Sequence, residues 1–213
     1  PYNRVMSHLS IVVPVLDEAS DIVATLASLR ELRARGCEVV VVDGGSRDAT
    51  RELAAPGADR VIASPRGRAA QMNAGARAAG GDILLFLHAD TRLPPGADQS
   101  VRLGMARTGA RWGRFDVTIA GASPMLRVVA RSMNARSRLT GIATGDQAIF
   151  ARRDAFEAVG GFPEIPLMED VALSKRLKGV SAPLCLRERV VTSGRRWERH
   201  GTLRTILLMW RLR

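Results

Sequence analysis

The chain has 213 residues, enough for one sizeable core, and it contains no apolar run near the roughly 18 residues that a transmembrane helix needs. Its net charge of +11 lies almost wholly in the second half, because residues 1–110 carry 13 basic and 12 acidic side chains, whereas residues 111–213 carry 19 and 9. This asymmetry favours a polyanionic partner, but only 4% of residues are aromatic and no basic patch is interleaved with rings, which argues against nucleic acid.

The first half of the chain alternates buried strands with amphipathic helices. β-branched residues dominate the strands, and apolar residues recur at helical spacing between them. The pattern predicts strands at 10–15, 38–42, 60–63 and 83–87 and helices at 17–35 and 68–79. Strand, helix and strand in this order form a right-handed parallel unit, so residues 8–110 are expected to form a parallel α/β sheet.

The second half is less regular but shows no internal repeat and no low-complexity linker. Its pattern predicts a strand at 112–119, a helix with a basic face at 124–139, a turn that enters a strand at 145–150, and helices at 153–159 and 169–177. A single domain is therefore expected, with a separate tail at its end.

That tail, residues 187–213, holds eight arginines and two glutamates. Leu203, Ile206, Leu207 and Trp210 recur in it at helical spacing, which predicts a basic amphipathic helix. Such a helix either binds an anionic membrane surface or packs on the core of its own protein.

The two cysteines predict a reduced compartment. Cys37 and Cys185 lack metal-type spacing and are expected to be small buried hydrophobes. Nothing before the first strand resembles a signal peptide, so the expected location is the cytoplasm, with the inner face of the membrane as the alternative if the tail binds lipid.

Polar side chains follow three of the predicted strands, where open parallel sheets bind their ligands. Glu18 follows the first strand, Asp43 the second, and His88 and Asp90 the fourth. Asp43 can accept the imide hydrogen of a uracil-like base or simply form a turn. Asp90 can ligate Mg²⁺ or Mn²⁺, and His88 is either a second ligand or a hydrogen-bonding neighbour.

Two further clusters carry candidate chemistry. Arg66 and Arg68 stand with two amides at a helix start, an arrangement that suits phosphate oxygens but also fits a solvated face with ordinary caps. Glu169 and Asp170 form an acidic pair that can supply a general base or cap a helix. No dinucleotide-binding or P-loop glycine pattern occurs in the chain.

Taken in order, these pieces resemble glycosyltransferase family 2, the inverting enzymes of the GT-A fold. The matching segments are 13–18 (VPVLDE), 43–46 (DGGS), 73–75 (NAG), 81–90 (GDILLFLHAD), 160–162 (GGF) and 169–170 (ED). Residues 195–197 (RRW) are similar to an arginine-tryptophan element of some members, without its preceding glutamine. The family usually has Asp where this chain has His88, which leaves metal affinity and metal identity open.

The resemblance implies a fold and a set of site residues. The fold is an α/β, Rossmann-like, open and mostly parallel sheet flanked by helices, in a single domain with a C-terminal helical tail. Residues 8–110 would bind the nucleotide sugar, residues 111–186 the acceptor, and residues 187–213 would form the tail. The implied nucleotide-sugar contacts are Pro14, Leu16, Glu18, Asp43, Arg66, Arg68, Gln71, Asn73, Ala89 and Asp90. The implied contacts to acceptor or diphosphate are Asp146, Gln147, Arg196 and Trp197, the metal residues are Asp90 and His88, and the catalytic residues are Asp170 and Glu169.

The implied function is transfer of a sugar, with inversion, from a UDP- or GDP-type nucleotide sugar to an acceptor hydroxyl, assisted by Mn²⁺ or Mg²⁺. A lipid-linked molecule is one candidate acceptor. The alternative is a non-catalytic nucleotide-sugar or polyanion-binding protein whose metal site has degenerated at His88.

Overall fold

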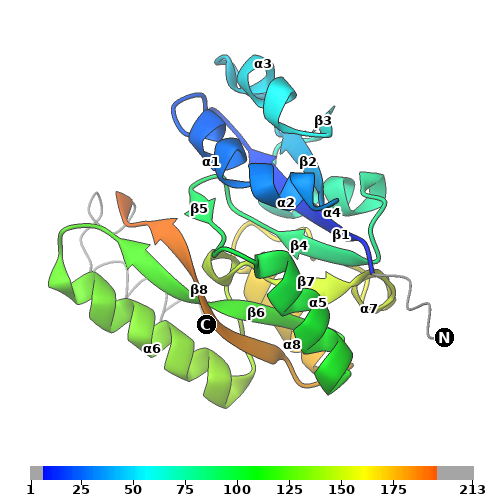
Figure 1. Cartoon of the computed structure of the whole chain (residues 1–213), viewed down its shortest axis with the longest axis vertical. Coiled ribbons are helices and arrows are strands. Elements are labelled where there is room, and N and C mark those ends of the chain that lie inside the picture. Colours follow the sequence, from blue (N-terminus) through cyan, green and yellow to red (C-terminus); the bar gives the residue numbers. More distant parts are fainter. Residues whose placement is uncertain (1–6, 196–213) are drawn as a thin grey trace.

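The computed structural model describes residues 7–195, which form one eight-stranded sheet in the order β3-β2-β1-β4-β7-β6-β8-β5 (Figure 1). The strands are β1 Leu9–Val15, β2 Glu38–Asp43, β3 Arg60–Ala63, β4 Ile83–Phe86, β5 Thr91–Arg92, β6 Trp112–Ala120, β7 Phe150–Arg152 and β8 Leu184–Ser193. The α-helices are α1 Ile22–Ser28, α2 Arg30–Ala34, α3 Thr50–Ala54, α4 Arg68–Ala78, α5 Ala97–Thr108, α6 Pro124–Thr140, α7 Arg153–Ala158 and α8 Glu169–Lys178. Two short 3₁₀ turns, η1 Ala55–Gly57 and η2 Gly145–Gln147, complete the described elements. No helix within residues 7–195 is long and apolar enough to cross a membrane.

The first four strands are parallel, as the sequence predicts. β2 and β4 flank β1, and the register places Pro14 beside Val42 and Val15 beside Asp43. The chain runs outward from β1 through β2 to β3 and then returns to β4 on the other side of β1. Ligands of open α/β sheets bind at such a reversal, outside the carboxyl ends of the strands. The end of β1 and the end of β4 therefore border the expected site.

The second half of the sheet mixes directions. β7 is antiparallel to β4 and β6, β6 is parallel to β8, and β5 is antiparallel to β8. Across the whole described sheet, four strand pairs are parallel and three are antiparallel, so the predicted mostly parallel α/β sheet is confirmed. The first residues of the predicted tail, 187–193, belong to strand β8. The predicted amphipathic stripe at 203–210 lies outside the described residues.

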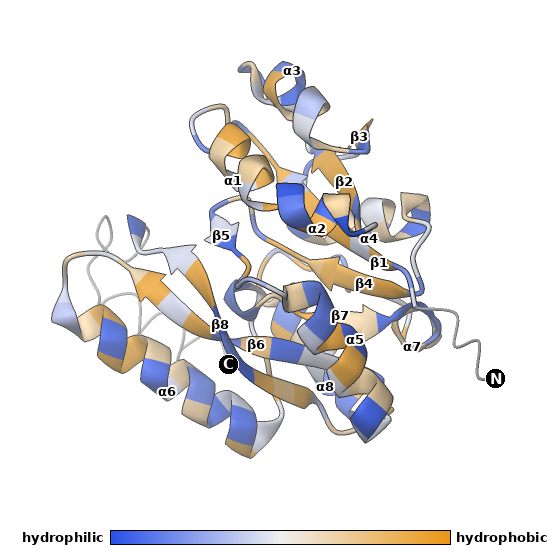
Figure 2. Ribbon diagram, viewed as in Figure 1, coloured by the Kyte–Doolittle hydropathy of each residue, from blue (hydrophilic) through white to orange (hydrophobic). Residues whose placement is uncertain are grey.

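Helices cover both faces of the sheet and enclose two apolar cores. The helices α1, α2, α5 and α6 contribute to one core, and α4, α7 and α8 contribute to the other. Figure 2 shows the apolar central strands between these layers. Gly75 lets α4 approach the sheet, because a Cβ atom there would lie 2.3 Å from a methyl of Val12 and 2.8 Å from one of Val42. This close contact fixes the axis of α4, whose first turn points toward the site.

One predicted helix is wrong in extent. The predicted helix at 17–35 is two helices, α1 and α2, which meet at Leu29. The backbone N–H of Leu29 bonds to the carbonyl of Leu26 three residues back, a tighter turn than the α-helix has. Residues 17–21 stay outside the helix, and Asp17 adopts a positive φ of 53°. The loop after β1 is therefore longer than predicted, and it is free to contact the loop after β2.

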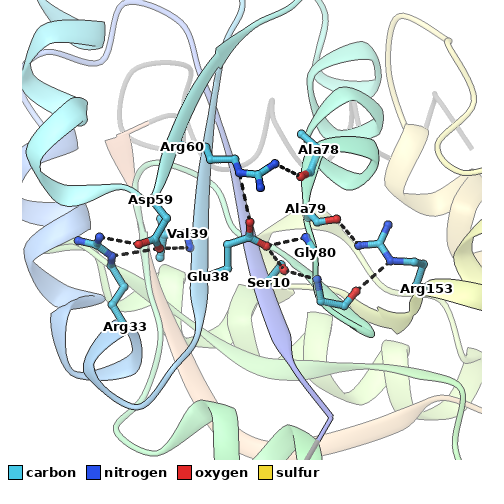
Figure 3. A network of polar contacts seen from close by, with 11 residues as sticks. Ser10, Arg33, Glu38, Val39, Asp59, Arg60, Ala78, Ala79, Gly80 and Arg153 are labelled. Atoms are coloured by element: carbon cyan, nitrogen blue, oxygen red, sulfur yellow. Dashed lines mark hydrogen bonds and ion pairs between the residues drawn. The ribbon is translucent and has the colours of Figure 1, made fainter.

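A polar network joins the strands at the opposite end of the sheet from the expected site (Figure 3). The Glu38 carboxylate accepts hydrogen bonds from the Ser10 hydroxyl at 2.5 Å and from the Gly80 backbone N–H at 2.7 Å. Arg60 forms an ion pair with Glu38 at 3.7 Å. Ser10 lies on β1 and Glu38 opens β2, so the network aligns the two strands at their starts.

Arg153 completes this network, and its loss is expected to destabilise the fold. Its guanidinium donates to the carbonyls of Gly81, Ala76 and Ala79 at 2.9, 2.8 and 2.6 Å. We expect Arg153→Met to lower the free energy of unfolding by about 1–3 kcal/mol, because three carbonyls lose a charged donor. Denaturant titration measures the change. The matched variant Arg77→Met, at an exposed position of α4, should stay near the parent protein, and equal losses in both would refute the role of the Arg153 contacts.

Candidate active site

The ends of β1 and β2 are tied together by one buried amide. Gln71 of α4 is 5% exposed, and its Nε2 donates to the carbonyl of Val15 at 2.7 Å and to that of Val42 at 2.9 Å. Gly44 follows β2 directly, and a Cβ atom there would lie 2.9 Å from the Gln71 side chain. The sequence predicts that Gln71 contacts the sugar nucleotide. In the structure Nε2 of this amide donates to both strand ends, and the contact of Gln71 with the sugar nucleotide stays a prediction.

Asp43 holds the loop that follows β2. Its carboxylate is 1% exposed and accepts from the backbone N–H groups of Gly45 and Ser46, each at 3.1 Å. The Ser46 hydroxyl accepts from the N–H of Asp17 at 2.9 Å, and the Asp17 carboxylate accepts from the N–H of Arg47 at 2.7 Å. The turn-forming role of Asp43 is thus visible in the structure, and its contact with a base stays a prediction.

A second set of charged groups gathers at the ends of β1, β4 and β8. Burial raises the pKa of the Glu18 carboxyl, the negative charge of Asp90 raises it further, and the positive charge of Arg195 lowers it. Arg195 also forms an ion pair with Asp21 at 2.7 Å. The N–H of Ser193 donates to the carbonyl of Asp90 at 3.2 Å. The two predicted acids Glu18 and Asp90 are therefore close enough to interact, with a cation beside them.

Three distant segments meet at Gly145. The His88 Nδ1 lies 3.4 Å from an Asp146 carboxylate oxygen, and a Cβ atom at Gly145 would lie 2.5 Å from the His88 ring. On its other side, the Gly145 N–H donates to Asp170 Oδ2 at 2.6 Å. The predicted metal residue His88, the predicted acceptor residue Asp146 and the predicted base Asp170 are thus brought together.

Asp170 has the environment of a base. Its two carboxylate oxygens accept from the N–H groups of Gly145 at 2.6 Å and Val171 at 2.7 Å. Burial raises the pKa of the Asp170 carboxyl, and the nearby charges of Glu169 and Asp146 raise it further, while the two backbone donors act in the opposite direction. A carboxylate with a raised pKa is better suited to accept a proton near neutral pH.

Glu169 is buried beside this carboxylate, with 4% of its surface exposed. One of its oxygens lies 3.5 Å from the guanidinium of Arg68, which opens α4. The pair links the first turn of α4 to the first turn of α8. Arg66 and Arg68 are both exposed to solvent, and Arg68 is partly engaged by an acid of the protein.

Asn73 and Phe162 join the segments 73–75 and 160–162, which both resemble family motifs. The Asn73 amide donates to the carbonyl of Phe162 at 2.8 Å and accepts from its N–H at 2.9 Å. Gly161 has a φ of 66°, and a Cβ atom there would lie 2.7 Å from Asn73 Oδ1. The sequence predicts that Asn73 contacts the nucleotide sugar. In the structure this amide clamps the loop leading to Glu169, and its contact with a nucleotide sugar stays a prediction.

The other predicted residues lie around this centre. Gln147 is fully buried, where it accepts from the N–H of Thr144 at 3.3 Å and donates to Asn134 at 3.4 Å, so it supports the turn η2. The carbonyl of the buried Ala89 accepts from the hydroxyl of Thr25. Pro14 and Leu16 are half-buried at the end of β1. Arg196 and Trp197 lie outside the described residues.

The candidate metal residues form a sparse set. Within residues 7–195 there is no group of three or more His, Cys, Asp or Glu side chains placed to hold a metal ion. Asp90 is half-buried at the end of β4. One or two carboxylates are enough to hold an ion such as Mg²⁺, whose remaining ligands are often phosphate oxygens and water.

The strand order, with its reversal at β1 and β4 and with helices on both faces, defines an α/β domain of the GT-A fold. The sequence model of Glycosyl transferase family 2 matches residues 10–160, and the chain belongs to this family. The Succinoglycan biosynthesis protein ExoA of Rhizobium meliloti (strain 1021) is 32% identical over 188 residues, which cover 78% of this chain and 57% of that protein.

Two solved structures share the fold. S. aureus TarS 1-349 in complex with UDP-GlcNAc matches with a TM-score of 0.72 and 17% identity, over 87% of this chain and 58% of that one. The mannosyltransferase PcManGT from Pyrobaculum calidifontis, in complex with GDP-Man and Mn²⁺, matches with a TM-score of 0.67 and 22% identity, over 87% and 56%. The chain therefore spans less than two thirds of the length of these relatives.

The contact between Gly145 and His88 is testable by a double-mutant cycle. We expect Gly145→Ala to lower the free energy of unfolding by about 1–3 kcal/mol, because the added methyl overlaps the imidazole. Removing the ring in the same chain, with His88→Ala, should recover part of that loss. Thermal or denaturant unfolding of the two single variants and the double variant measures the coupling. Additive effects would show that the ring does not press on the turn.

Proposed function

We propose that the protein transfers a sugar from a UDP- or GDP-type nucleotide sugar to the hydroxyl of an acceptor, with inversion. The observation that carries the proposal is the placement of Asp170, a carboxylate with a raised pKa that is held by the Gly145 N–H at the edge where β1 and β4 end. The related folds that hold UDP-GlcNAc and GDP-Man support the donor class.

The reaction is a single displacement. Asp170 accepts the proton of the acceptor hydroxyl as its oxygen forms a bond to the anomeric carbon. The bond from that carbon to the diphosphate oxygen breaks, and the leaving nucleoside diphosphate keeps the electron pair. Attack opposite the leaving group inverts the anomeric configuration. The buried Glu169, paired with Arg68, fixes the first turn of α8, on which the base is carried.

Mn²⁺ or Mg²⁺ fits the site through Asp90, with the interacting Glu18 close by. A bound ion would neutralise charge on the departing diphosphate. The geometry of His88 favours the role of a neighbour over that of a ligand, because its Nδ1 faces Asp146 and its Nε2 lies against Gly145. The Mn²⁺ in the PcManGT complex supports divalent-metal use.

The proposal extends to location and acceptor. We place the enzyme in the cytoplasm, peripheral to the inner face of the membrane, with a lipid-linked molecule as one candidate acceptor. The support from the sequence is the net positive charge of residues 187–213, eight arginines against two glutamates. Anionic lipid attracts such segments.

Asp90→Ala is expected to abolish the metal-dependent part of nucleotide binding, because this side chain supplies the carboxylate for the ion. Titration of UDP and GDP with and without Mn²⁺ measures the effect. Asp82→Ala is the matched control, since Asp82 lies just before β4, at the end opposite Asp90. If Asp90→Ala keeps the full Mn²⁺-dependent affinity, the ion is held elsewhere.

Asp170→Asn tests the proposed function directly. We expect transfer, or hydrolysis of the donor, to fall by roughly 100-fold to 10,000-fold while nucleotide binding stays close to that of the parent chain. Asp154→Asn is a matched control, because Asp154 also lies in the first turn of a helix and accepts from the next N–H at 2.7 Å. Equal losses of binding and turnover would make Asp170 a structural cap, and turnover in neither the parent nor the variant would favour a non-catalytic binder.

The parent enzyme should also show the raised pKa of Asp170 in its pH profile. The base acts in its ionised form, so activity is lost as the pH falls through the pKa of the folded protein. Because burial raises that pKa, the acidic limb of kcat/KM is expected above the ordinary aspartate value of about 3.9. A limb at or below that value would contradict the assigned role.

A further inference from the structure

The outer face of α6 carries an apolar stripe beside a basic stripe. Met125, Val128 and Leu139 are 44%, 54% and 88% exposed, so three large apolar side chains of this helix face solvent. Their spacing of three and eleven residues places them on one side of the outer face. Arg127 and Arg131, four residues apart, are exposed along the other side.

The orientation of this helix is fixed by its inner face. Leu126, Val129, Ala130 and Met133 are buried in the core and pack toward β6. The outer residues therefore cannot turn inward without exposing that core. Figure 2 shows the alternation of apolar and polar bands along α6 at the edge of the molecule.

The charge on the outer face has one sign. The 17 residues of α6 include four arginines and no acidic residue. Arg138 is engaged with Asp116 at 2.6 Å. Arg127 and Arg131, in contrast, have no acidic partner in the part of the chain that the structure describes. The face therefore attracts anions.

We propose that the outer face of α6 is a docking surface for an anionic lipid bilayer. The helix lies in the plane of the membrane, where Arg127 and Arg131 bind acidic headgroups and Met125, Val128 and Leu139 enter the boundary of the acyl chains. A basic stripe beside an apolar stripe is the pattern of helices that bind at the membrane interface. This surface belongs to the folded domain and is distinct from the predicted tail.

Charge argues against the other possible occupants. A second copy of the chain, seated α6 against α6, would bring two basic stripes together. Residues 196–213, which the structure does not describe, contain five arginines and one glutamate, so they are also repelled. Acidic headgroups carry the charge opposite to the basic stripe, and acyl chains are apolar like the stripe beside it.

The position of α6 connects this surface to the candidate site. The first turn of α6 lies against the chain just after β8, because a Cβ atom at Gly194 would lie 3.0 Å from the Leu126 side chain. The next residue, Arg195, pairs with Asp21 beside the acids Glu18 and Asp90. A membrane bound at α6 would thus lie next to the mouth of the site.

Co-sedimentation of the full chain with vesicles tests the proposal. The vesicles are phosphatidylcholine alone or with phosphatidylglycerol, and the variants are Arg127→Gln with Arg131→Gln, and Val128→Asn with Leu139→Asn. The matched control is Arg51→Gln with Leu53→Asn on α3, which also has an exposed arginine and an exposed leucine and lies at the far end of the molecule (Figure 1). The tail is the same in all four chains.

We expect the parent and the α3 control to bind anionic vesicles better than neutral ones. Each arginine removed from α6 should weaken this binding roughly fivefold. The variant Val128→Asn with Leu139→Asn should weaken the binding at high salt as well, because salt does not screen apolar contacts. Binding of both α6 variants at the parent level, or no preference of the parent for anionic vesicles, would overturn the proposal. A parent dimer that the α6 variants lose would also overturn it, in favour of a second copy. Nucleotide binding with Mn²⁺, measured on the same variants, should be unchanged. Failure of the membrane proposal can therefore be distinguished from failure of the proposed function.

Discussion

The site depends on the bridge that Gln71 makes between the carboxyl ends of β1 and β2. One buried amide from α4 donates to the carbonyls of Val15 and Val42 at these ends, and the carbonyl of Val15 also accepts from the backbone N–H of Gly44 at 3.0 Å. Leaving a buried carbonyl without a donor costs about 1–3 kcal/mol, so these hydrogen bonds hold the starts of the two loops beyond the strands in place. The contact also ties α4 to the sheet, and Arg68 of α4 in turn pairs with Glu169. One amide therefore links the loops after β1 and β2 to the helix that carries the proposed base.

Much of the fold follows from the sequence, because the valine-rich strands β1 and β2 and the apolar β4 have no other stable place than a covered parallel sheet. The sequence does not predict strand β8, because three consecutive charged and exposed residues, Arg187, Glu188 and Arg189, interrupt its apolar pattern. The short helix α3 and the break between α1 and α2 at Leu29 depend on loop contacts, which the spacing of apolar residues does not reveal. The sequence also shows that the acids at the ends of β1 and β4 share an edge, since parallel strands end on the same side.

The hydrogen-bond partners of the Gln71 and Asn73 amides could not be predicted from the sequence. Gln71 and Asn73 stand beside arginines at a helix start, which is also what a phosphate site requires, and only tertiary contacts show that their partners are backbone groups. His88 illustrates a related limit. Its sequence position suggests a metal ligand, whereas in the structure its ring occupies the space above Gly145, whose N–H holds Asp170. His88, just after β4, thus contacts Gly145, and Gly145 in turn holds the proposed base Asp170.

We propose that the acids at the ends of β1 and β4 form a metal-assisted site for a nucleoside diphosphate, beside a base on α8. Thermal unfolding of the intact chain with UDP or GDP, each with and without Mn²⁺, tests it most directly. We expect at least one nucleotide to raise the Tm when Mn²⁺ is present and to raise it far less when Mn²⁺ is absent. No rise in Tm with either nucleotide in the presence of Mn²⁺ would contradict it.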